Sequence, residues 1–196
     1  MIQLQNTMKL EGANRLRALK TALIETTFFD DPASTKYHGA YAGGLAAHSF
    51  NVVNNLQHLT EKLGLRWITP ESPTIIGLAH DVCKIGAYIP NNTSTVYTWN
   101  PNQPPGHGGL SVERTKEWIE LTEEEEACIR YHMGAFCNKD IVDIGRDAIQ
   151  REWNRYTDAI HQFPNVLYTH TADMMASHID EVSHAETTSV APNRGL

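Results

Sequence analysis

Ionisable side chains interrupt the apolar faces of this chain's helical patterns, and they constrain its fold more than any other sequence feature. One apolar stripe steps by three or four residues from Leu45 through His48 to Leu63, the spacing of an amphipathic helix. A second apolar run, TIIGLAHDVCKIG at 74–86, carries His80 and Asp81 at its centre. Burying such groups costs several kcal/mol unless they are paired or bound to a metal. The fold must therefore supply partners for them.

The periodicity of nearly the whole chain is helical, so we predict an all-α helical bundle. Helices are expected at about 9–28, along the stripe from Leu45 to Leu63, from Ser72 through the 74–86 run, at about 107–119, from Thr122 through His132, at 146–160 and at 164–181. Ser72 is the expected N-cap and Pro73 the first helical residue. Thr122 and Glu125 form a capping box, and the run Glu123–Glu126 is expected to be a solvated helix start.

The domain organisation is expected to be simple. The 196 residues fit one domain, 1–196, with a core at about 9–182 and a loose polar tail at 184–196. Only the segment 87–106 breaks the helical pattern, and Tyr88, Val96, Tyr97 and Trp99 predict a short hairpin or irregular loop there. A loop of this length often forms part of a binding site.

Six ionisable residues lie on or beside predicted core faces, although they come from five separate helices or helix starts. They are His48, His80, Asp81, His107, His132 and Asp173. A shared metal centre would satisfy all of them, because neutral imidazole and carboxylate bind Zn, Mn, Fe or Ni. If two metals are present, Asp81 can bridge them through its two oxygens. Cys83, next to these residues, is expected to be a small core residue, and His170 and His178 to be supporting or structural.

The order H…HD…H…H…D, with HD-x-x-K at 80–84, resembles the HD-domain metal-dependent phosphohydrolase superfamily. Three further segments carry the resemblance. KYHGAYAGGLAAHS (36–49), GHGGLSV (106–112) and HTADMMASHID (170–180) are similar to segments of YhaM-type HD-domain exoribonucleases and related phage hydrolases. The resemblance implies an HD-domain helical bundle in which the six residues named above are metal ligands. It also implies two divalent cations, with Mn, Fe, Zn, Co, Ni and Mg as candidates.

The resemblance implies a mechanism in which a metal-activated water attacks phosphorus. Asp81 is then catalytic, Lys84 offsets charge on the phosphoryl oxygens, and His38 donates a proton or contacts substrate. The segments 36–44 and 87–106 are expected to form the pocket walls. The residues expected to bind substrate are Lys36, Tyr37, Lys84, Tyr88, Arg114 and Arg130, and a nucleotide base would stack on Tyr37, Tyr88 or Trp99.

The expected activity is hydrolysis of a phosphoester or phosphoanhydride bond in a nucleotide, a signalling nucleotide or a short oligonucleotide. The net charge of −7 and the lack of a preceding OB-fold argue against long nucleic acid as a partner. The alternatives are a mixed-valent di-iron oxygenase of a small organic substrate, a 3′→5′ exonuclease or phosphodiesterase, and a non-catalytic binding module. Three cysteines and no signal peptide or membrane-spanning run predict a cytoplasmic protein. The sequence leaves the oligomeric state open.

Overall fold

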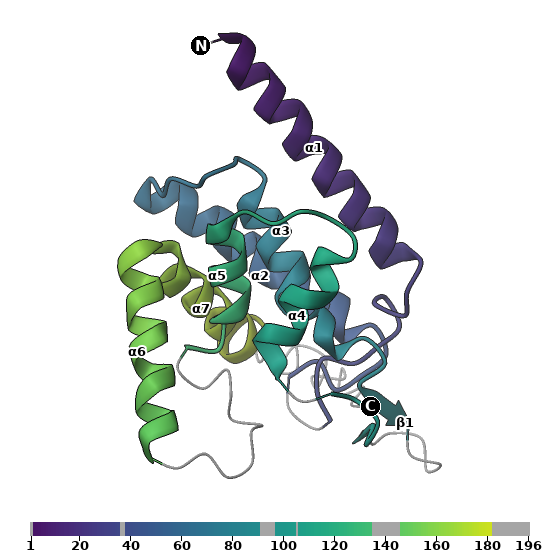
Figure 1. Cartoon of the computed structure of the whole chain (residues 1–196). Coiled ribbons are helices and arrows are strands. Elements are labelled where there is room, and N and C mark those ends of the chain that lie inside the picture. Colours follow the sequence, from purple (N-terminus) through teal and green to yellow (C-terminus); the bar gives the residue numbers. More distant parts are fainter. Residues whose placement is uncertain (1, 36–37, 91–96, 105, 135–145, 182–196) are drawn as a thin grey trace, which may run out of the picture.

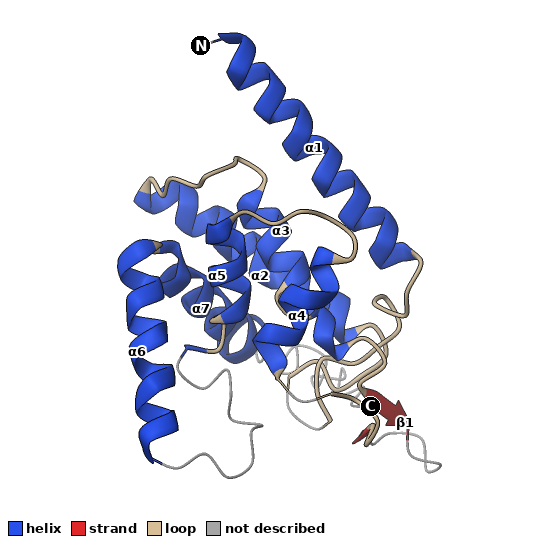
Figure 2. Cartoon of the chain, in the orientation of Figure 1, coloured by secondary structure: helices blue, strands red, loops and turns tan. Residues whose placement is uncertain are grey.

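A computed structural model of the chain describes residues 2–35, 38–90, 97–104, 106–134 and 146–181. Within these residues the protein is all-α apart from one short hairpin, which confirms the predicted fold class (Figures 1 and 2). The helices are α1 (Ile2–Ile24), α2 (Gly44–Leu63), α3 (Ser72–Ala79), α4 (His107–Lys116), α5 (Glu123–Arg130), α6 (Arg146–Gln162) and α7 (Asn165–Met175). Among the described helices, none has both the length and the apolar character needed to cross a bilayer.

Helix α1 begins and ends earlier than predicted. The second half of the helix packs against the bundle. Its N-terminal end extends beyond the other helices in Figure 1, whereas Leu19 and Leu23 are buried. Arg15 binds Glu125 of α5 through two hydrogen bonds of 2.7 and 3.1 Å. Such a bidentate contact between arginine and a carboxylate is stronger and more directional than a single hydrogen bond.

The start of α5 contains the predicted capping box, with Thr122 and Glu125 bonding reciprocally. The prediction that Glu123–Glu126 is solvated is wrong for two of its members. Glu125 is fully buried, and Glu124 is 5% exposed. Glu124 accepts hydrogen bonds from the amide of Ile68 and from the side chain of Asn165, both at 2.8 Å. Partners supplied by other segments of the chain therefore compensate for the burial of these charges.

Helix α2 begins where the preceding loop packs tightly against it. Gly43, the N-cap, has φ 81°, a left-handed conformation that favours glycine. A Cβ atom on Gly44 would lie 2.0 Å from the carbonyl oxygen of Gly39, so this position has no room for a side chain. The two glycines thus serve a tight turn and a close backbone contact, which position the helix that carries His48.

Helix α3 is shorter than predicted and ends at Ala79. Glu71, not Ser72, is its N-cap, and Pro73 lies in the first turn. Beyond it, Asp81 has non-helical backbone angles and the chain forms a 3₁₀ turn (η1, Val82–Lys84). The Nη1 atom of Arg114 donates to the carbonyls of Val82, Cys83 and Ile85 at 3.0–3.1 Å. These bonds satisfy carbonyls that a continuous helix would have paired internally.

The predicted break at 87–106 contains an antiparallel hairpin of β1 (Tyr88–Pro90) and β2 (Tyr97–Trp99). Tyr88 is opposite Trp99, and their rings pack edge to face with centroids 5.6 Å apart. Val96, which was predicted to belong to this element, lies outside the described residues.

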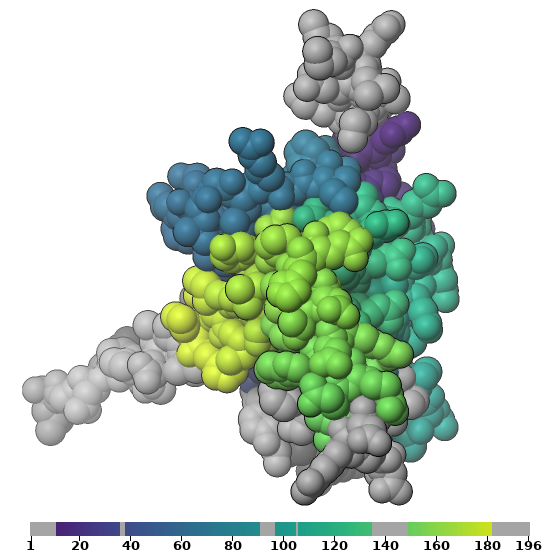
Figure 3. All heavy atoms as spheres, turned by 60° about the vertical axis from the view of Figure 1, so that its left-hand side comes forward, coloured from purple at the N-terminus to yellow at the C-terminus, as the bar shows by residue number. Residues whose placement is uncertain are grey.

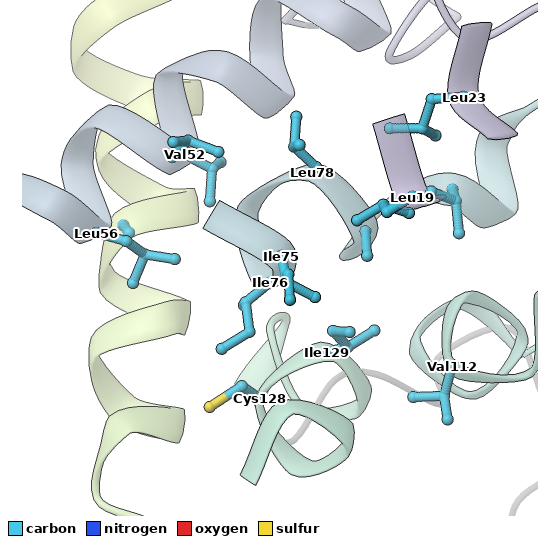
Figure 4. Packing of buried hydrophobic residues seen from close by; sticks show 14 of the residues in the cluster. Leu19, Leu23, Val52, Leu56, Ile75, Ile76, Leu78, Val112, Cys128 and Ile129 are labelled. Carbon is cyan, nitrogen blue, oxygen red and sulfur yellow. The ribbon is translucent and has the colours of Figure 1, made fainter. Parts of the chain in front are cut away.

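The hydrophobic core lies between α2, α3, α5 and α7, with contributions from α1 and α4 (Figure 4). Ile75 and Ile76 of α3 are fully buried in its centre, with Val52 and Leu56 of α2 and Ile129 of α5 around them. Helix α6 lies on the outside of the bundle, against α7 (Figure 3). The last helix changes character after α7, where residues Ala176–Asp180 form a π-helical turn (η3).

Candidate metal centre

The fold brings together the six residues that the sequence predicts as metal ligands. His48 comes from the second turn of α2, His80 and Asp81 from the end of α3, and His107 from the first turn of α4. His132 follows α5, and Asp173 lies near the end of α7. Gly77 allows α3 to pack closely against α2, because a Cβ there would lie 2.8 Å from the backbone nitrogen of Val53. With the helices this close, His48 Nε2 and His80 Nε2 lie 3.2 Å apart.

Asp81 lies at the middle of the group, and its two carboxylate oxygens face different histidines. Oδ2 lies 3.4 Å from His80 Nε2 and 3.6 Å from His48 Nε2. Oδ1 lies 3.0 Å from His107 Nε2 and 3.4 Å from His132 Nε2. Asp173 joins the first side, with Oδ1 3.1 Å from His48 Nε2. We refer to these as the His48–His80 side and the His107–His132 side of the centre.

The opposite ring nitrogen, Nδ1, of each histidine makes a hydrogen bond away from the centre. In His80 and His132 it bonds the carbonyl three residues earlier, Gly77 O at 2.8 Å and Ile129 O at 2.7 Å. In His48 and His107 a side chain takes this place, Glu181 Oε1 at 2.7 Å and Cys83 Sγ at 2.9 Å. Because Nδ1 is engaged in this way, Nε2 is the atom that each ring turns toward the centre, the usual arrangement of metal-binding histidines. A cation would displace any proton on Nε2.

Two buried atoms at the centre lack a hydrogen bond of good geometry within the described part of the chain. They are Asp81 Oδ1 and His132 Nε2. Their residues are only 1% exposed, so water does not readily compensate for the missing bonds. Unpaired oxygen and nitrogen lone pairs that face one another are the donors a divalent cation needs. The residues present therefore fit a metal centre.

The electrostatics of the His48–His80 side stabilise charged forms. Burial alone lowers the pKa of His48, but its hydrogen bonds to Asp173 and Glu181 raise it to about 9. Burial would raise the pKa of Asp173, but hydrogen bonding to His48 and the nearby His80 and His132 hold it well below its usual value. The centre thus keeps its carboxylate ionised, the form in which it binds cations.

On the His107–His132 side, burial and the neighbouring charged groups also act on the pKa values in opposite directions. Burial opposes the charge of Asp81, yet Lys84, His80 and His107 hold its pKa well below the usual value. Burial lowers the pKa of His107, but Cys83 and Asp81 raise it to about 10. For His132 burial dominates and lowers the pKa, so this ring is neutral, as a ligand must be.

Of the four cationic residues predicted to bind substrate, the three within the described chain differ in their surroundings. Lys84 lies at the centre, with Nζ 2.7 Å from Asp81 Oδ2, and this pairing raises its pKa against the effect of burial. Arg114 binds the backbone carbonyls of the 82–85 turn, so its contacts are structural, and they supply no evidence for the predicted substrate contact. Arg130 Nη1 lies against Gly109, in the same turn of α4 as His107.

The remaining predicted residues lie at the edge of the centre or outside the described chain. The ring of His38 packs 4.9 Å from that of His48, and burial and Lys84 lower its pKa to about 4. His38 is therefore neutral at pH 7, and its role as a proton donor stays a prediction. Tyr88 is half-buried near Lys84, whose pKa it helps to raise. Lys36 and Tyr37 lie outside the described residues, as does the predicted tail.

Sequence reasoning missed two contacts of the centre. Glu181 was given no role, yet it binds His48. Cys83 is buried as predicted, but it also contacts His107. Its position in HD-x-C-K was the only sequence signal for that contact. Of the two supporting histidines, His170 bonds the carbonyl of His132 at 2.7 Å, whereas His178 is exposed.

Among the six residues of the centre, His107 and Asp173 are the most exposed to solvent. His48, His80 and His132 have side chains at most 1% exposed, while those of His107 and Asp173 are each 15% exposed. A substrate would therefore approach at His107 and Asp173. In comparisons with known proteins, no protein-family model, no curated protein and no solved structure matches this chain.

Proposed function

We propose that this protein is a metal-dependent phosphohydrolase of the HD-domain type that acts on a nucleotide. One observation carries the proposal: the Nε2 atoms of four histidines face the two oxygens of Asp81 in two pairs, and each Nδ1 atom is hydrogen-bonded away from the centre. This arrangement suits two divalent cations, one on each side. Asp173 would complete the His48–His80 side.

Two cations bound there would supply Lewis acidity and an activated water for attack on phosphorus. The chain's own residues then have definite tasks. Asp81 holds the two sides of the centre at a fixed separation, and Lys84 fixes the Oδ2 end of its carboxylate through the 2.7 Å contact. The ammonium group of Lys84 also places a positive charge beside the centre, where it would attract a phosphoryl group.

Exposure of the ligands indicates where substrate would lie. His107 and Asp173 are the most exposed of the six residues, and the loop residue His38 packs on His48. The Tyr88–Trp99 hairpin follows directly after the η1 turn that carries Lys84, and its aromatic rings offer stacking surfaces for a base. An anionic substrate gains most of its attraction from cations in such a site, which is compatible with the chain's net charge of −7.

A second function, oxygenation of a small organic substrate at a di-iron centre, is favoured by one observation. Two described cationic side chains beside the HD-x-x-K segment are already engaged, Lys84 by Asp81 and Arg114 by three carbonyls. A less charged substrate would need fewer free cations. Tightly bound iron with an EPR-active Fe(II)/Fe(III) pair, together with oxygen consumption, would favour this alternative.

The proposal is tested by removing metal from the purified protein and then adding Mn²⁺, Co²⁺, Ni²⁺ or Mg²⁺ before assay against a nucleotide panel. Chromatography of the products distinguishes release of phosphate, release of triphosphate and cleavage of a diester. We expect activity only with added metal, and two ions per chain. Full activity of the metal-free protein would refute the proposal, as would a wild-type chain that binds no metal.

Matched variants identify the site. His132→Ala should lower the metal content and abolish hydrolysis, because it removes a buried ligand. His178→Ala should change neither, because His178 is an exposed histidine of the last helix. Equal loss in both variants would contradict the assignment of the centre.

A further inference from the structure

The contact that holds His48 differs from those that hold the buried His80 and His132. Each of those two rings bonds a carbonyl three residues earlier in its own segment, so its orientation follows from local structure. His48 Nδ1 instead bonds Glu181, which is 133 residues away in the chain. The Glu181 side chain is 9% exposed and that of His48 is fully buried, so the bond lies almost entirely out of water.

The π-helical turn Ala176–Asp180 places Glu181 where it can make this contact. In a regular α-helix each residue turns by about 100°, so residues seven apart share a face and the eighth residue lies off it. Asp173 and Glu181 are eight residues apart, yet both reach His48, with Asp173 Oδ1 3.1 Å from Nε2 and Glu181 Oε1 2.7 Å from Nδ1. The wider turn of a π-helix reduces the rotation per residue and brings Glu181 onto the face of Asp173. Such turns often occur at functional sites.

We propose that Glu181 is a positioning residue for the metal centre, and this inference rests on the proposed function. By accepting a hydrogen bond from Nδ1–H, Glu181 keeps the ring of His48 in one orientation, with Nε2 toward Asp81 and Asp173. A carboxylate behind a metal-binding histidine also raises the basicity of the ring. Loss of such a partner typically costs about 10- to 100-fold in metal affinity.

The neighbouring residue Asp180 provides a control that distinguishes a positioning role of Glu181 from a purely structural one. Asp180 lies on the same π-helical turn and also contacts α2, with Oδ2 2.8 Å from Asn55 Nδ2. This hydrogen bond joins Asp180 to Asn55 and not to the ring of His48. Asp180→Ala therefore removes a similar hydrogen bond between the last helix and α2 but leaves the hydrogen bond between Glu181 and His48 in place.

The experiment measures Mn²⁺ and Co²⁺ affinity by competition with a chelator for the wild type, Glu181→Ala, Glu181→Gln and Asp180→Ala. Circular dichroism melts of the metal-free proteins show that each variant folds. We expect Glu181→Ala to bind about 10- to 100-fold more weakly and to change the visible absorption spectrum of bound Co²⁺. Glu181→Gln should retain most of the affinity, because its amide oxygen still accepts from Nδ1–H. Asp180→Ala should bind like the wild type.

Two results would overturn the inference while leaving the proposed function intact. One is a wild-type affinity and Co²⁺ spectrum in Glu181→Ala. The other is an equal loss in Glu181→Ala and Asp180→Ala, which would show that docking of the last helix, and not the histidine contact, is responsible. A wild-type chain that binds neither cation would overturn the proposed function, and the inference with it.

Discussion

Replacing Asp81 by asparagine is expected to destabilise the metal-free protein, because it leaves Lys84 as a buried charge without its carboxylate. Lys84 Nζ lies 2.7 Å from Asp81 Oδ2, and the Lys84 side chain is only 10% exposed. Removing one member of a buried ion pair typically costs about 3–5 kcal/mol. The asparagine oxygen can still accept a hydrogen bond from Lys84, so we expect the lower end, about 3 kcal/mol. For a chain of this size that corresponds to a fall of about 6–12 °C in Tm.

The double variant Asp81→Asn/Lys84→Met tests the cause of this loss. Methionine keeps an unbranched apolar stem and removes the charge, so the double variant should recover about 2 kcal/mol relative to Asp81→Asn alone. Stability is measured by denaturant unfolding in the presence of a chelator, followed by far-ultraviolet circular dichroism. If the double variant is no more stable than Asp81→Asn, the unpaired ammonium is not the source of the loss and the reasoning fails.

Three further predictions concern parts of the fold around the centre. Gly77→Ala should lower stability by about 1–3 kcal/mol, because its Cβ would lie 2.8 Å from the backbone nitrogen of Val53; an unchanged denaturation midpoint would contradict this packing. Glu125→Ala should lower the free energy of unfolding by about 3 kcal/mol, because it leaves Arg15 without its buried carboxylate and removes the capping box. The metal affinity of this variant, measured by chelator competition, should stay the same. Burial raises the pKa of the Cys128 thiol from its ordinary 9.0, so the native state keeps a proton that the unfolded state loses. Stability should therefore fall as pH rises above that value, and mass spectrometry should find Cys128 alkylated by iodoacetamide only after unfolding.

Periodicity predicts most of the fold, because the buried faces of the helices follow a regular spacing. The stripe around His48 becomes α2, and Thr122 and Glu125 cap α5 as predicted. The prediction fails where long-range contacts outweigh local pattern. The apolar run at 74–86 ends as a helix at Ala79, because Arg114, far away in the sequence, satisfies the carbonyls beyond it.

In the candidate site, too, features that follow local periodicity are predicted and features that depend on long-range contacts are not. Its six predicted ligands could be identified because ionisable residues on apolar faces need partners, and the fold does bring them together. Glu181 could not be identified in this way, because its contact with His48 depends on the π-helical turn before it. The contact of Cys83 with His107 likewise depends on the 3₁₀ turn that follows Asp81. Both turns depart from the periodicity on which the predictions rely.

If two cations bind as proposed, both would lie beside the carboxylate of Asp81, so their binding would not be independent. A first cation on either side would neutralise part of the negative charge that attracts the second and would repel it directly at short range. We therefore expect the second cation to bind more weakly than the first. By thermodynamic reciprocity each cation lowers the affinity for the other by the same factor, so a titration should require two distinct dissociation constants. At limiting metal concentrations most molecules would then carry one ion, and a reaction that needs both would depend steeply on metal supply.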